Sequence, residues 1–593
     1  MTGHSAISDR LDRVNELGFV GRAGLLGLVA ALGLLTALRI LAFGWSGIAP
    51  DDARYLYVGL SLLDGHGAIT ADGAVFLLRS PVYSVVLGFG ARLTPNDPVG
   101  GAHLAALAVA LGGFATAVVL GWRLGGQRAG AATAVAIAAT PLLWALVPTL
   151  RIDLAQAAGV VAILLVIGRP TPARWLLAGL LLGLTVLVKE SALPLLLLPG
   201  AFLGTMGGRR LVAFGGLYVT AAVVAAGWWW VVVWREAGAI FPANALAVIE
   251  RRQVGTDLSV GIVGAILLPI MLIGWLRVAA LARREPAVRP LLLAALLLTP
   301  PALYATANGL DARNYTTLAV LSAVAVGVAV TNLPRLPAVT SQMAGRSLAT
   351  ALVVLATLAV VAGQIAAPVA SRPPLPDLVA TWLRSHTEPG DRIAMTFRYR
   401  AVVALLLYGR NEVAELRPRR VGPTDDPSWF VWMGLRDRQL FGYTRAQWTK
   451  ILAEPGTRAL AIVTPHELAP ADLLPVLERG LPAAGIEPVG TLRPGGPEAA
   501  LFAVHQAELP VDIAALPFVL QPDAALAWLD LDEGNSSALA RFVAARPIVV
   551  GDAAAVAPLL ERLGSEACSV PAADLGPDQP AIRIELGGSA ACP

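Results

Sequence analysis

Long apolar blocks follow one another along the first two thirds of the chain and then stop. They fill residues 23–370, whereas residues 371–593 have the mixed composition of a soluble domain. An α-helix needs about 20 apolar residues to cross the hydrocarbon of a membrane. The pattern therefore predicts a polytopic α-helical membrane domain over 23–370, a polar segment over 1–22 before it, and a separate C-terminal domain after it.

Within the membrane domain we predict about eleven transmembrane helices. Several of them are short, which is typical of broken helices sheltered by other helices. The expected spans are 23–46, 98–121, 129–147, 153–168, 174–188, 191–206, 211–234, 258–281, 290–306, 315–332 and 347–369.

Arginines indicate the topology of these spans. Cytosolic loops of membrane proteins are enriched in basic residues. With the N-terminus in the cytosol, every inner segment has at least two arginines, and an odd number of spans places the C-terminal domain outside. Counting the short apolar stretch Pro81–Leu93 as a span would invert the later loops, so we expect it to lie in the outer interface. The inner arginines are Arg10, Arg13, Arg22, Arg123, Arg128, Arg169, Arg174, Arg209, Arg210, Arg277, Arg283, Arg284, Arg289, Arg335 and Arg346.

The C-terminal part, 371–593, has the pattern of an α/β domain. A helical spacing over 377–386 precedes apolar runs near 389–397, 458–465 and 546–552 that predict strands. A further set of elements begins near residue 510, which leaves open whether this part forms one domain or two subdomains. Its two cysteines, Cys568 and Cys592, could pair if the domain is extracytoplasmic or could stay as free thiols.

Composition supports a membrane protein. Hydrophobic residues make up 56% and charged residues 15% of the chain, whereas soluble domains carry about 25% charge. The net charge of +4 comes from arginines in the predicted cytosolic loops, so it does not indicate a nucleic-acid partner. The first apolar block has no small-residue cleavage signal and is expected to stay in the protein. Abundant Ala, Gly, Arg and Pro with only two lysines favours a high-GC bacterium, hence the bacterial cytoplasmic membrane.

On this topology, ionisable residues gather at the outer face. The first outer loop begins with the adjacent carboxylates Asp51 and Asp52, followed by Arg54 and Tyr55. Tyr55 shares one helical face with Val58 and Leu62, which predicts an amphipathic interfacial helix. The later outer loops contribute Arg79, Arg151 and Asp153, Lys189 and Glu190, Arg251 and Arg252, and Arg313 with Tyr315.

Charges near hydrocarbon are costly and usually have a task or a partner. Each of these residues also has a structural alternative, namely a solvated loop end, a side chain that reaches the interface, or an ion pair. Taken together, the ionisable residues of the outer loops predict a site. In it, carboxylates can accept a proton and neighbouring cations can bind phosphate. Flat outer helices over broken spans would admit a lipid tail, so a lipid-linked phosphate donor fits the set.

The motifs resemble those of the GT-C superfamily of membrane glycosyltransferases, especially its family-39 branch of protein O-mannosyltransferases and aminoarabinose transferases. The hallmark of that branch is an acidic pair opening the first outer loop, here "PDDARY", with Asp52 where Glu is common. The other similar elements are "LLRSPVYSVVLGF" (77–89), "RIDLAQAA" (151–158), "VLVKESALPLLLLP" (186–199) and "DARNYTTLAVL" (311–321). The resemblance covers about residues 20–370. Arg79 stands where Lys is usual, and Asn314 separates an arginine and a tyrosine that are normally adjacent.

The resemblance implies a GT-C fold and transfer of a sugar from a polyprenyl-phosphate donor to an extracytoplasmic glycan, lipid or protein. Asp51 is then the expected general base, Asp153 would position the acceptor or a partner, and Asp52 would orient Arg54 or help bind a divalent ion. Arg79, Lys189, Arg251 and Arg313 would hold the donor phosphate, with Arg54, Tyr55 and Tyr315 as further substrate-binding residues. Family-39 enzymes generally work without a metal, so we expect no obligatory cofactor.

Other functions stay open at this point. A secondary transporter would place ionisable groups near the bilayer midplane and would show a repeat, which we do not find. A non-catalytic glycan-binding protein would make the acidic pair dispensable. A related GT-C enzyme, such as an arabinofuranosyltransferase or a metal-dependent oligosaccharyltransferase, is a closer alternative. The sequence identifies neither the sugar nor the acceptor.

Overall fold

The computed structural model describes residues 19–43, 48–238 except 72, 74 and 78, 262–307 and 312–331, together with shorter stretches between 358 and 586. The chain divides into two compact units. We call Met1–Ile69 with Val75–Arg372 the helical unit, and Thr70–Ala74 with Pro373–Pro593 the sheet unit.

The helical unit begins with α2 (Phe19–Phe43) and two short helices, α3 (Pro50–Leu63) and α4 (Val82–Leu93). Pro50 occupies the first turn of α3, where its missing N–H costs nothing. Two aspartates follow in that turn, where the positive end of the helix dipole favours acidic side chains. The sequence therefore fixes the start of α3 at its acidic pair.

The next four helices are α5 (Pro98–Gly125), α6 (Gln127–Ala139), α7 (Pro141–Leu146) and α8 (Ile152–Ile167). The predicted span 129–147 is thus two helices, broken at Thr140, whose backbone is extended. Pro141 explains the break, because a proline disfavours helical backbone in the residue before it. The predicted spans 98–121 and 153–168 correspond to α5 and α8.

The rest of the unit comprises α9 (Pro172–Val188), η1 (Glu190–Phe202), α10 (Gly208–Ala237), α12 (Ile262–Ala282), η2 (Pro286–Val288), α13 (Arg289–Ala307), η3 (Ala312–Tyr315) and α14 (Thr316–Thr331). Residues 191–206 were expected to form a membrane-spanning α-helix. The structure instead has the 3-10 helix η1 there, over 13 residues. Pro194 and Pro199 lie inside it and lack the N–H groups that an α-helix would use.

Four described helical stretches are long and apolar enough to cross a membrane: Pro98–Gly125, Gly208–Ala237, Pro286–Tyr304 and Arg313–Val330. Six further apolar helices are shorter, between 10 and 17 residues. Exposed aliphatic side chains such as Leu34, Leu184, Val224 and Leu272 cover the outer sides of the helices, as lipid-facing surfaces require. The helical unit is that of a polytopic membrane protein. The count of eleven spans stays a prediction, since most of 347–369 lies outside the described residues.

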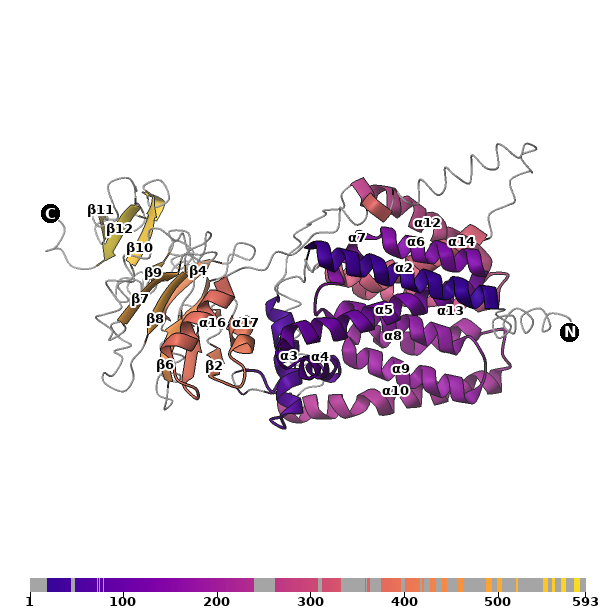
Figure 1. The fold of residues 1–593 in the computed structure, drawn as a ribbon, viewed down its shortest axis with the longest axis horizontal. Helices are drawn as coiled ribbons and strands as arrows, with labels where there is room; N and C mark the ends of the chain where they lie inside the picture. The colour runs from indigo at the N-terminus through magenta and orange to yellow at the C-terminus, as the bar shows by residue number, and fades with distance from the viewer. Residues whose placement is uncertain are drawn as a thin grey trace. The chain divides into compact units, whose positions relative to one another are not determined.

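The core lies between α5, α8, α9, α10 and α14 (Figure 1). α9 packs along α10, and α5 packs along α8. The largest fully buried side chains include Phe114, Trp144, Trp175 and Tyr218. The Trp144 indole donates to the Ile137 carbonyl at 2.9 Å, and the Tyr218 hydroxyl donates to the Leu195 carbonyl at 2.9 Å. These two hydrogen bonds satisfy the polar groups of the buried Trp144 and Tyr218 side chains.

Two glycines bring α3 and α4 into close contact. A Cβ atom on Gly59 would lie 1.9 Å from the Ser84 carbonyl oxygen, and one on Gly88 would lie 2.7 Å from the backbone of Gly59. No side chain fits at either position. The stretch 81–93 is helical, as predicted, but α3 is more buried than a purely interfacial helix. Asp52, Leu56 and Val58 are all covered.

The sheet unit contains α16 (Leu375–His386), α17 (Arg400–Leu406) and two mixed sheets. The first has the order β2-β1-β6-β8-β7, and the second has the order β11-β12-β10-β9-β4-β5-β3. The strands are β1 (Arg392–Met395), β2 (Glu412–Glu415), β3 (Arg419–Arg420), β4 (Pro427–Met433), β5 (Leu440–Thr444), β6 (Thr457–Ala461), β7 (Glu487–Leu492), β8 (Ala499–Ala503), β9 (Val519–Leu520), β10 (Ile548–Asp552), β11 (Ala567–Pro571) and β12 (Ala581–Leu586).

Helix α16 and strands β1, β6 and β10 lie where the sequence predicts a helix and strands. A boundary near residue 510 does not fit the pairing, however, because β4 hydrogen-bonds to β9 in parallel, with Phe430 opposite Val519. Strands from both sides of that position therefore share one sheet. Cys568 lies in β11, and Cys592 lies outside the described residues.

Candidate active site

The first turn of α3 meets the loop before α8 through an ion-pair network. Asp51 Oδ2 lies 3.2 Å from Arg151 Nη1, and Asp52 Oδ1 lies 3.1 Å from Arg151 Nε. Arg151 precedes the first residue of α8 and has extended backbone. One guanidinium thus holds both members of the acidic pair.

The two aspartates differ sharply in exposure. The side chain of Asp52 is 2% exposed and that of Asp51 is 40% exposed. Burial raises the pKa of Asp52 to about 6, although the charge of Arg151 opposes the shift. Burial would also lower the pKa of Arg151, but Asp52 and Asp51 together raise it above its ordinary value. Asp51 is therefore the member of the pair that a substrate can reach.

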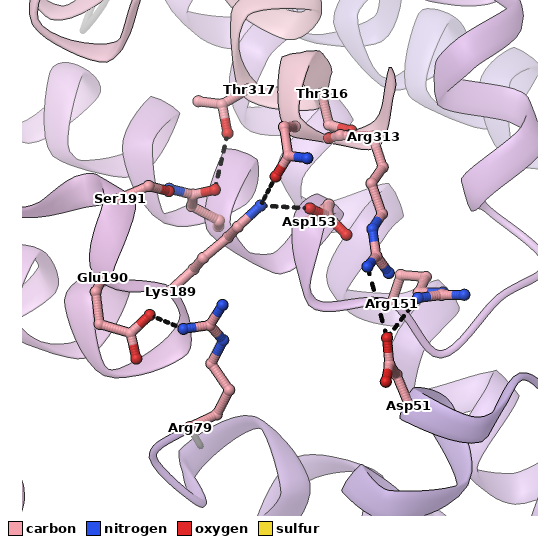
Figure 2. A network of polar contacts seen from close by, with 12 residues as sticks. Asp51, Arg79, Arg151, Asp153, Lys189, Glu190, Ser191, Arg313, Thr316 and Thr317 are labelled. Carbon is pink, nitrogen blue, oxygen red and sulfur yellow. Dashed lines mark hydrogen bonds and ion pairs between the residues drawn. The ribbon is translucent and has the colours of Figure 1, made fainter. Parts of the chain in front are cut away.

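Two more arginines approach Asp51. Arg313, in η3, lies 3.5 Å from Asp51 Oδ2, and Arg54, one turn along α3, lies 3.6 Å from Asp51 Oδ1. Both arginine side chains are about a quarter exposed, at 23% and 24%. Figure 2 shows Arg151 and Arg313 pointing at Asp51 from the opposite side of the site. Asp51 is thus a half-exposed carboxylate among three guanidinium groups.

A second group joins α8, η1 and η3 beside the first. Lys189 Nζ donates to Asp153 Oδ1 at 2.7 Å and to Asn314 Oδ1 at 3.0 Å. The side chains of Asp153 and Lys189 are 3% and 11% exposed. Lys189 is the last residue before η1, and its extended backbone ends α9 there. The ammonium group therefore links three segments that are 36 and 125 residues apart.

A further ion pair joins Arg79, in the loop before α4, to Glu190, the first residue of η1. Burial would lower the pKa of Arg79, but the charge of Glu190 and a hydrogen bond to Tyr55 raise it above its ordinary value. Burial raises the pKa of Tyr55, so its hydroxyl stays protonated. The Tyr55 ring packs edge-on against Phe76 at 6.1 Å. Both side chains of the ion pair keep more than a quarter of their surface exposed.

An uncharged layer lies beside the charged one (Figure 2). Gln156 Nε2 donates to Ser191 Oγ at 2.7 Å, and Thr317 Oγ1 donates to Gln156 Oε1 at 3.4 Å. A pocket opens here, lined by Gln156, Ser191, Leu298, Pro301, Ala302, Asn314, Thr317 and Leu318.

Among the residues that the structure describes, the network joins five cations to four anions. Its cations are Arg54, Arg79, Arg151, Lys189 and Arg313, and its anions are Asp51, Asp52, Asp153 and Glu190. Such a cluster of cations suits an anionic ligand, since guanidinium and ammonium groups form strong hydrogen bonds with phosphate oxygens.

Most of the residues predicted from the sequence lie together here. Asp51, Asp52, Asp153, Arg54, Tyr55, Arg79, Lys189 and Arg313 belong to one network. Tyr315 lies in η3 and is half-buried, while Arg251 lies outside the described residues. Asp52 pairs with Arg151, and Arg54 pairs with Asp51. The role expected for Asp52, to orient Arg54 or to help bind a divalent ion, stays a prediction.

The sequence interpretation did not assign site roles to Arg151, Glu190, Asn314 or Gln156. Arg151 stands two residues before Asp153, at the start of a predicted span. This position could have indicated that Arg151 belongs to the site. Gln156 lies one helical turn after Asp153, on the same face of α8. Asn314 was treated only as an interruption of a motif, yet it accepts a hydrogen bond from Lys189.

Metal ions in proteins are usually held by several His, Cys, Asp or Glu side chains. Within the stretches that the structure describes, no three His, Cys, Asp or Glu side chains gather in one place. The carboxylates of the network instead face arginine and lysine side chains. Independence from a metal stays a prediction.

Two solved structures of ArnT from Cupriavidus metallidurans share the architecture of this chain. The one bound to undecaprenyl phosphate aligns with a TM-score of 0.55 over 83% of this chain and 99% of that chain, at 16% identity. The apo state aligns with a TM-score of 0.53 over 81% and 98%, at 15% identity. The Archaeoglobus fulgidus oligosaccharyltransferase tethered with an acceptor peptide aligns with a TM-score of 0.49 over 74% and 69%, at 14% identity.

No protein-family model and no curated protein matches the sequence. At such low identity the solved structures show the fold alone. The fold of this chain is therefore that of the solved ArnT structures, as the resemblance of the motifs led us to expect.

Proposed function

From the premise that this chain has the GT-C fold, we propose that it is a membrane glycosyltransferase that moves a sugar from a polyprenyl-phosphate donor to an acceptor at the outer face of a bacterial cytoplasmic membrane. The observation that carries the proposal is the half-exposed Asp51 carboxylate among Arg54, Arg151 and Arg313. ArnT, which shares the fold, was crystallised with undecaprenyl phosphate, and a lipid phosphate of that class suits a site where several guanidinium groups gather.

The proposed reaction is a displacement at the anomeric carbon. The acceptor hydroxyl oxygen attacks that carbon, the bond from the carbon to the phosphate oxygen breaks, and polyprenyl phosphate leaves with the electron pair. Asp51 takes the proton of the hydroxyl as general base. Its 40% exposed side chain leaves room for an acceptor, whereas the buried Asp52 cannot touch one.

The leaving phosphate gains negative charge, so the site must supply positive charge at that moment. Arg313 and Arg79 are suited to this role, because 23% and 29% of their side-chain surface stays exposed. Lys189 is more deeply buried and already contacts Asp153 and Asn314. We assign Lys189 and Asp153 to holding α8 and η3 in register at the site, with Asp52 positioning Arg151 in the same way. Arg251 keeps its expected phosphate role as a proposal.

These cations supply the charge compensation that a divalent ion would otherwise provide, so we propose a reaction without an obligatory metal. In the proposed topology the N-terminus is cytosolic and the C-terminal α/β domain is extracytoplasmic. The acceptor is a glycan, lipid or protein outside the cell.

The decisive experiment is sugar transfer by the purified full-length chain in lipid vesicles, supplied with polyprenyl-phosphate sugars and an envelope extract as acceptor source. Asp51→Asn should lower the transfer rate by about two orders of magnitude or more, because it removes the proton acceptor. Asp64→Asn is the matched control, since Asp64 ends the same helix and pairs with Arg92, away from the network. Equal turnover by the wild type and a folded Asp51→Asn variant would overturn the assignment of the base.

A further inference from the structure

The end of the helical unit opposite the charged network is rich in arginine. Asp153 and Lys189 mark the network ends of α8 and α9, and the other ends of these two helices meet at the turn 169–174. Together with the turns 123–128 and 206–210, this turn contains six arginines and no aspartate or glutamate. In the proposed topology this end faces the cytosol, where basic residues are enriched.

Three of these arginines form a cluster. Arg123, in the last turn of α5, donates from Nη1 to the Leu165 carbonyl near the end of α8, at 3.0 Å. Arg169 and Arg174 flank the start of α9, and their positive charges repel that of Arg123. All three residues are half-buried. Like charges that are partly withdrawn from water are costly, and a bound anion would stabilise them.

Helix dipoles add positive potential at the same end. Helices α6, α9 and α10 begin there without a side-chain cap and without an acidic residue in the first turn, whereas α3, α8 and η1 begin at the network with acidic residues. The first turns of α6, α9 and α10 instead contain arginines, namely Arg128, Arg174, Arg209 and Arg210. The positive end of a helix dipole disfavours cations and favours anions. An anion bound among the arginines would therefore offset both the dipoles and the clustered charges.

Close packing brings the start of α10 beside the start of α9. Gly179 and Gly183 of α9 face Tyr218 and Ala222 of α10, and a Cβ atom on Gly179 would lie 2.2 Å from the Tyr218 carbonyl oxygen. Residue numbers rise together along the two helices, so they run in parallel and both begin at the arginine-rich end (Figure 1). The positive ends of α9 and α10 therefore point into one region.

An exposed apolar stripe runs along α9 from the cluster. Leu177, Leu180 and Leu184 follow Arg174 at helical spacing, and they are 46%, 37% and 46% exposed. A soluble anion such as inorganic phosphate would leave this stripe unused. A phospholipid would place its phosphate on the arginines and an acyl chain on the leucines, so the combination favours a phospholipid.

We propose that Arg123, Arg169 and Arg174 bind the phosphate of an anionic phospholipid of the cytosolic leaflet, with one acyl chain lying along α9. Guanidinium groups bind phosphate oxygens through paired, charge-assisted hydrogen bonds. Basic pockets between membrane helices on the cytosolic side are suited to anionic headgroups. The bound lipid joins the ends of α5, α8 and α9. This site is separate from the charged network, and the proposal does not depend on the transfer reaction.

Lipid binding to the purified full-length protein in detergent tests the proposal, with bound lipid measured by native mass spectrometry. The probes are dioleoyl phosphatidylglycerol, which is anionic, and dioleoyl phosphatidylcholine, which has the same acyl chains but no net charge. The wild type should bind phosphatidylglycerol about tenfold more tightly than phosphatidylcholine. An excess of inorganic phosphate should not displace the bound phosphatidylglycerol.

Arg174→Gln should weaken phosphatidylglycerol binding by about fivefold and leave phosphatidylcholine binding unchanged within about twofold. Arg174→Lys should lose less, because lysine keeps the charge but not the planar fork. Arg123→Gln is a second variant, since its amide can still donate to the Leu165 carbonyl. Arg235→Gln is the matched control, because Arg235 is an exposed arginine in the last turn of α10, at the other end of that helix.

Equal affinities of the wild type for the two phospholipids would overturn the proposal. So would unchanged phosphatidylglycerol binding in both Arg174→Gln and Arg123→Gln. Loss of that binding in Arg313→Gln, but not in Arg174→Gln, would place the lipid at the charged network instead. Displacement by inorganic phosphate would show a site for a soluble anion and not for a lipid.

Discussion

The guanidinium of Arg151 lies 3.1 Å from the carboxylate of Asp52, a side chain that is 2% exposed. The same guanidinium also contacts the half-exposed Asp51. This geometry separates the acidic pair into a residue that can meet a substrate and a residue that holds an arginine. This division of roles, and other contacts near the site, predict measurable changes in stability, in ligand binding and in the rate of sugar transfer.

The first concerns Arg151 itself. Arg151→Met leaves the buried Asp52 without its partner, and breaking a buried pair costs about 3–5 kcal/mol. We expect a lower thermal unfolding midpoint in detergent. The double variant Arg151→Met with Asp52→Asn removes the orphaned charge and should recover much of the loss. A double variant no more stable than the single one would contradict the arrangement. Arg151→Lys should be intermediate, because an ammonium cannot bridge two carboxylates as a planar guanidinium does.

The raised pKa of Asp52, about 6, makes stability depend on pH in a defined direction. Between an unfolded value near 3.8 and the folded value, the folded protein binds more protons than the unfolded one. Stability conferred by this carboxyl is therefore full below about pH 4 and is lost as pH rises through about 6. The free energies of unfolding of the wild type and of Asp52→Asn should be measured from pH 4 to 7. As the pH rises over this range, the wild type should lose roughly 2–3 kcal/mol relative to Asp52→Asn. A pH-independent difference would show that Asp52 titrates normally.

Glu190 and a donor phosphate should compete for Arg79. Arg79→Gln removes the cation and should weaken binding of undecaprenyl phosphate by about tenfold, as expected for one charge-assisted contact. Glu190→Gln frees the same guanidinium and should strengthen that binding by a few fold. Microscale binding assays in nanodiscs would measure both. If Glu190→Gln weakened binding as much as Arg79→Gln, the pair would serve only to place η1.

The contact between Gly59 and Gly88 should tolerate no side chain. Gly59→Ala places a methyl group 1.9 Å from the Ser84 carbonyl oxygen, and overpacking of this kind costs about 1–3 kcal/mol. Because α3 carries Asp51, the transfer rate should fall with stability. Gly112→Ala is the control, since its methyl group meets nothing within 4 Å and alanine favours a helix. Equal thermal midpoints for Gly59→Ala and wild type would mean that α3 and α4 can separate.

Sequence reasoning could locate the site because charges near hydrocarbon are few. Asp51, Asp153, Lys189 and Arg313 each interrupt or flank an apolar block, so a single topology placed all four at one face. It could not predict the pairings, because Asp51 and Arg151 are 100 residues apart and nothing in either loop specifies the other. The partner of Asp52 was missed for the same reason.

The apolar pattern also could not predict whether the segment after Lys189 forms an α-helix or a 3-10 helix. The stretch after Lys189 is apolar throughout, so its composition predicts a membrane helix but not the hydrogen-bond spacing within it. Pro194 and Pro199 signal an irregularity, yet an α-helix with kinks and a 3-10 helix satisfy the same pattern. Gln156 was overlooked because a lone amide in an apolar helix is inconspicuous until its partners on η1 and α14 are known.

The 3-10 geometry of η1 changes how far its chain can reach. A residue of a 3-10 helix advances about 2.0 Å along the axis, against about 1.5 Å in an α-helix. Thirteen residues therefore extend about 26 Å instead of about 20 Å, close to the roughly 30 Å of a bilayer's hydrocarbon layer. Although η1 has only thirteen residues, it is long enough to span most of the hydrocarbon layer, with Glu190 and Ser191 at its first turn.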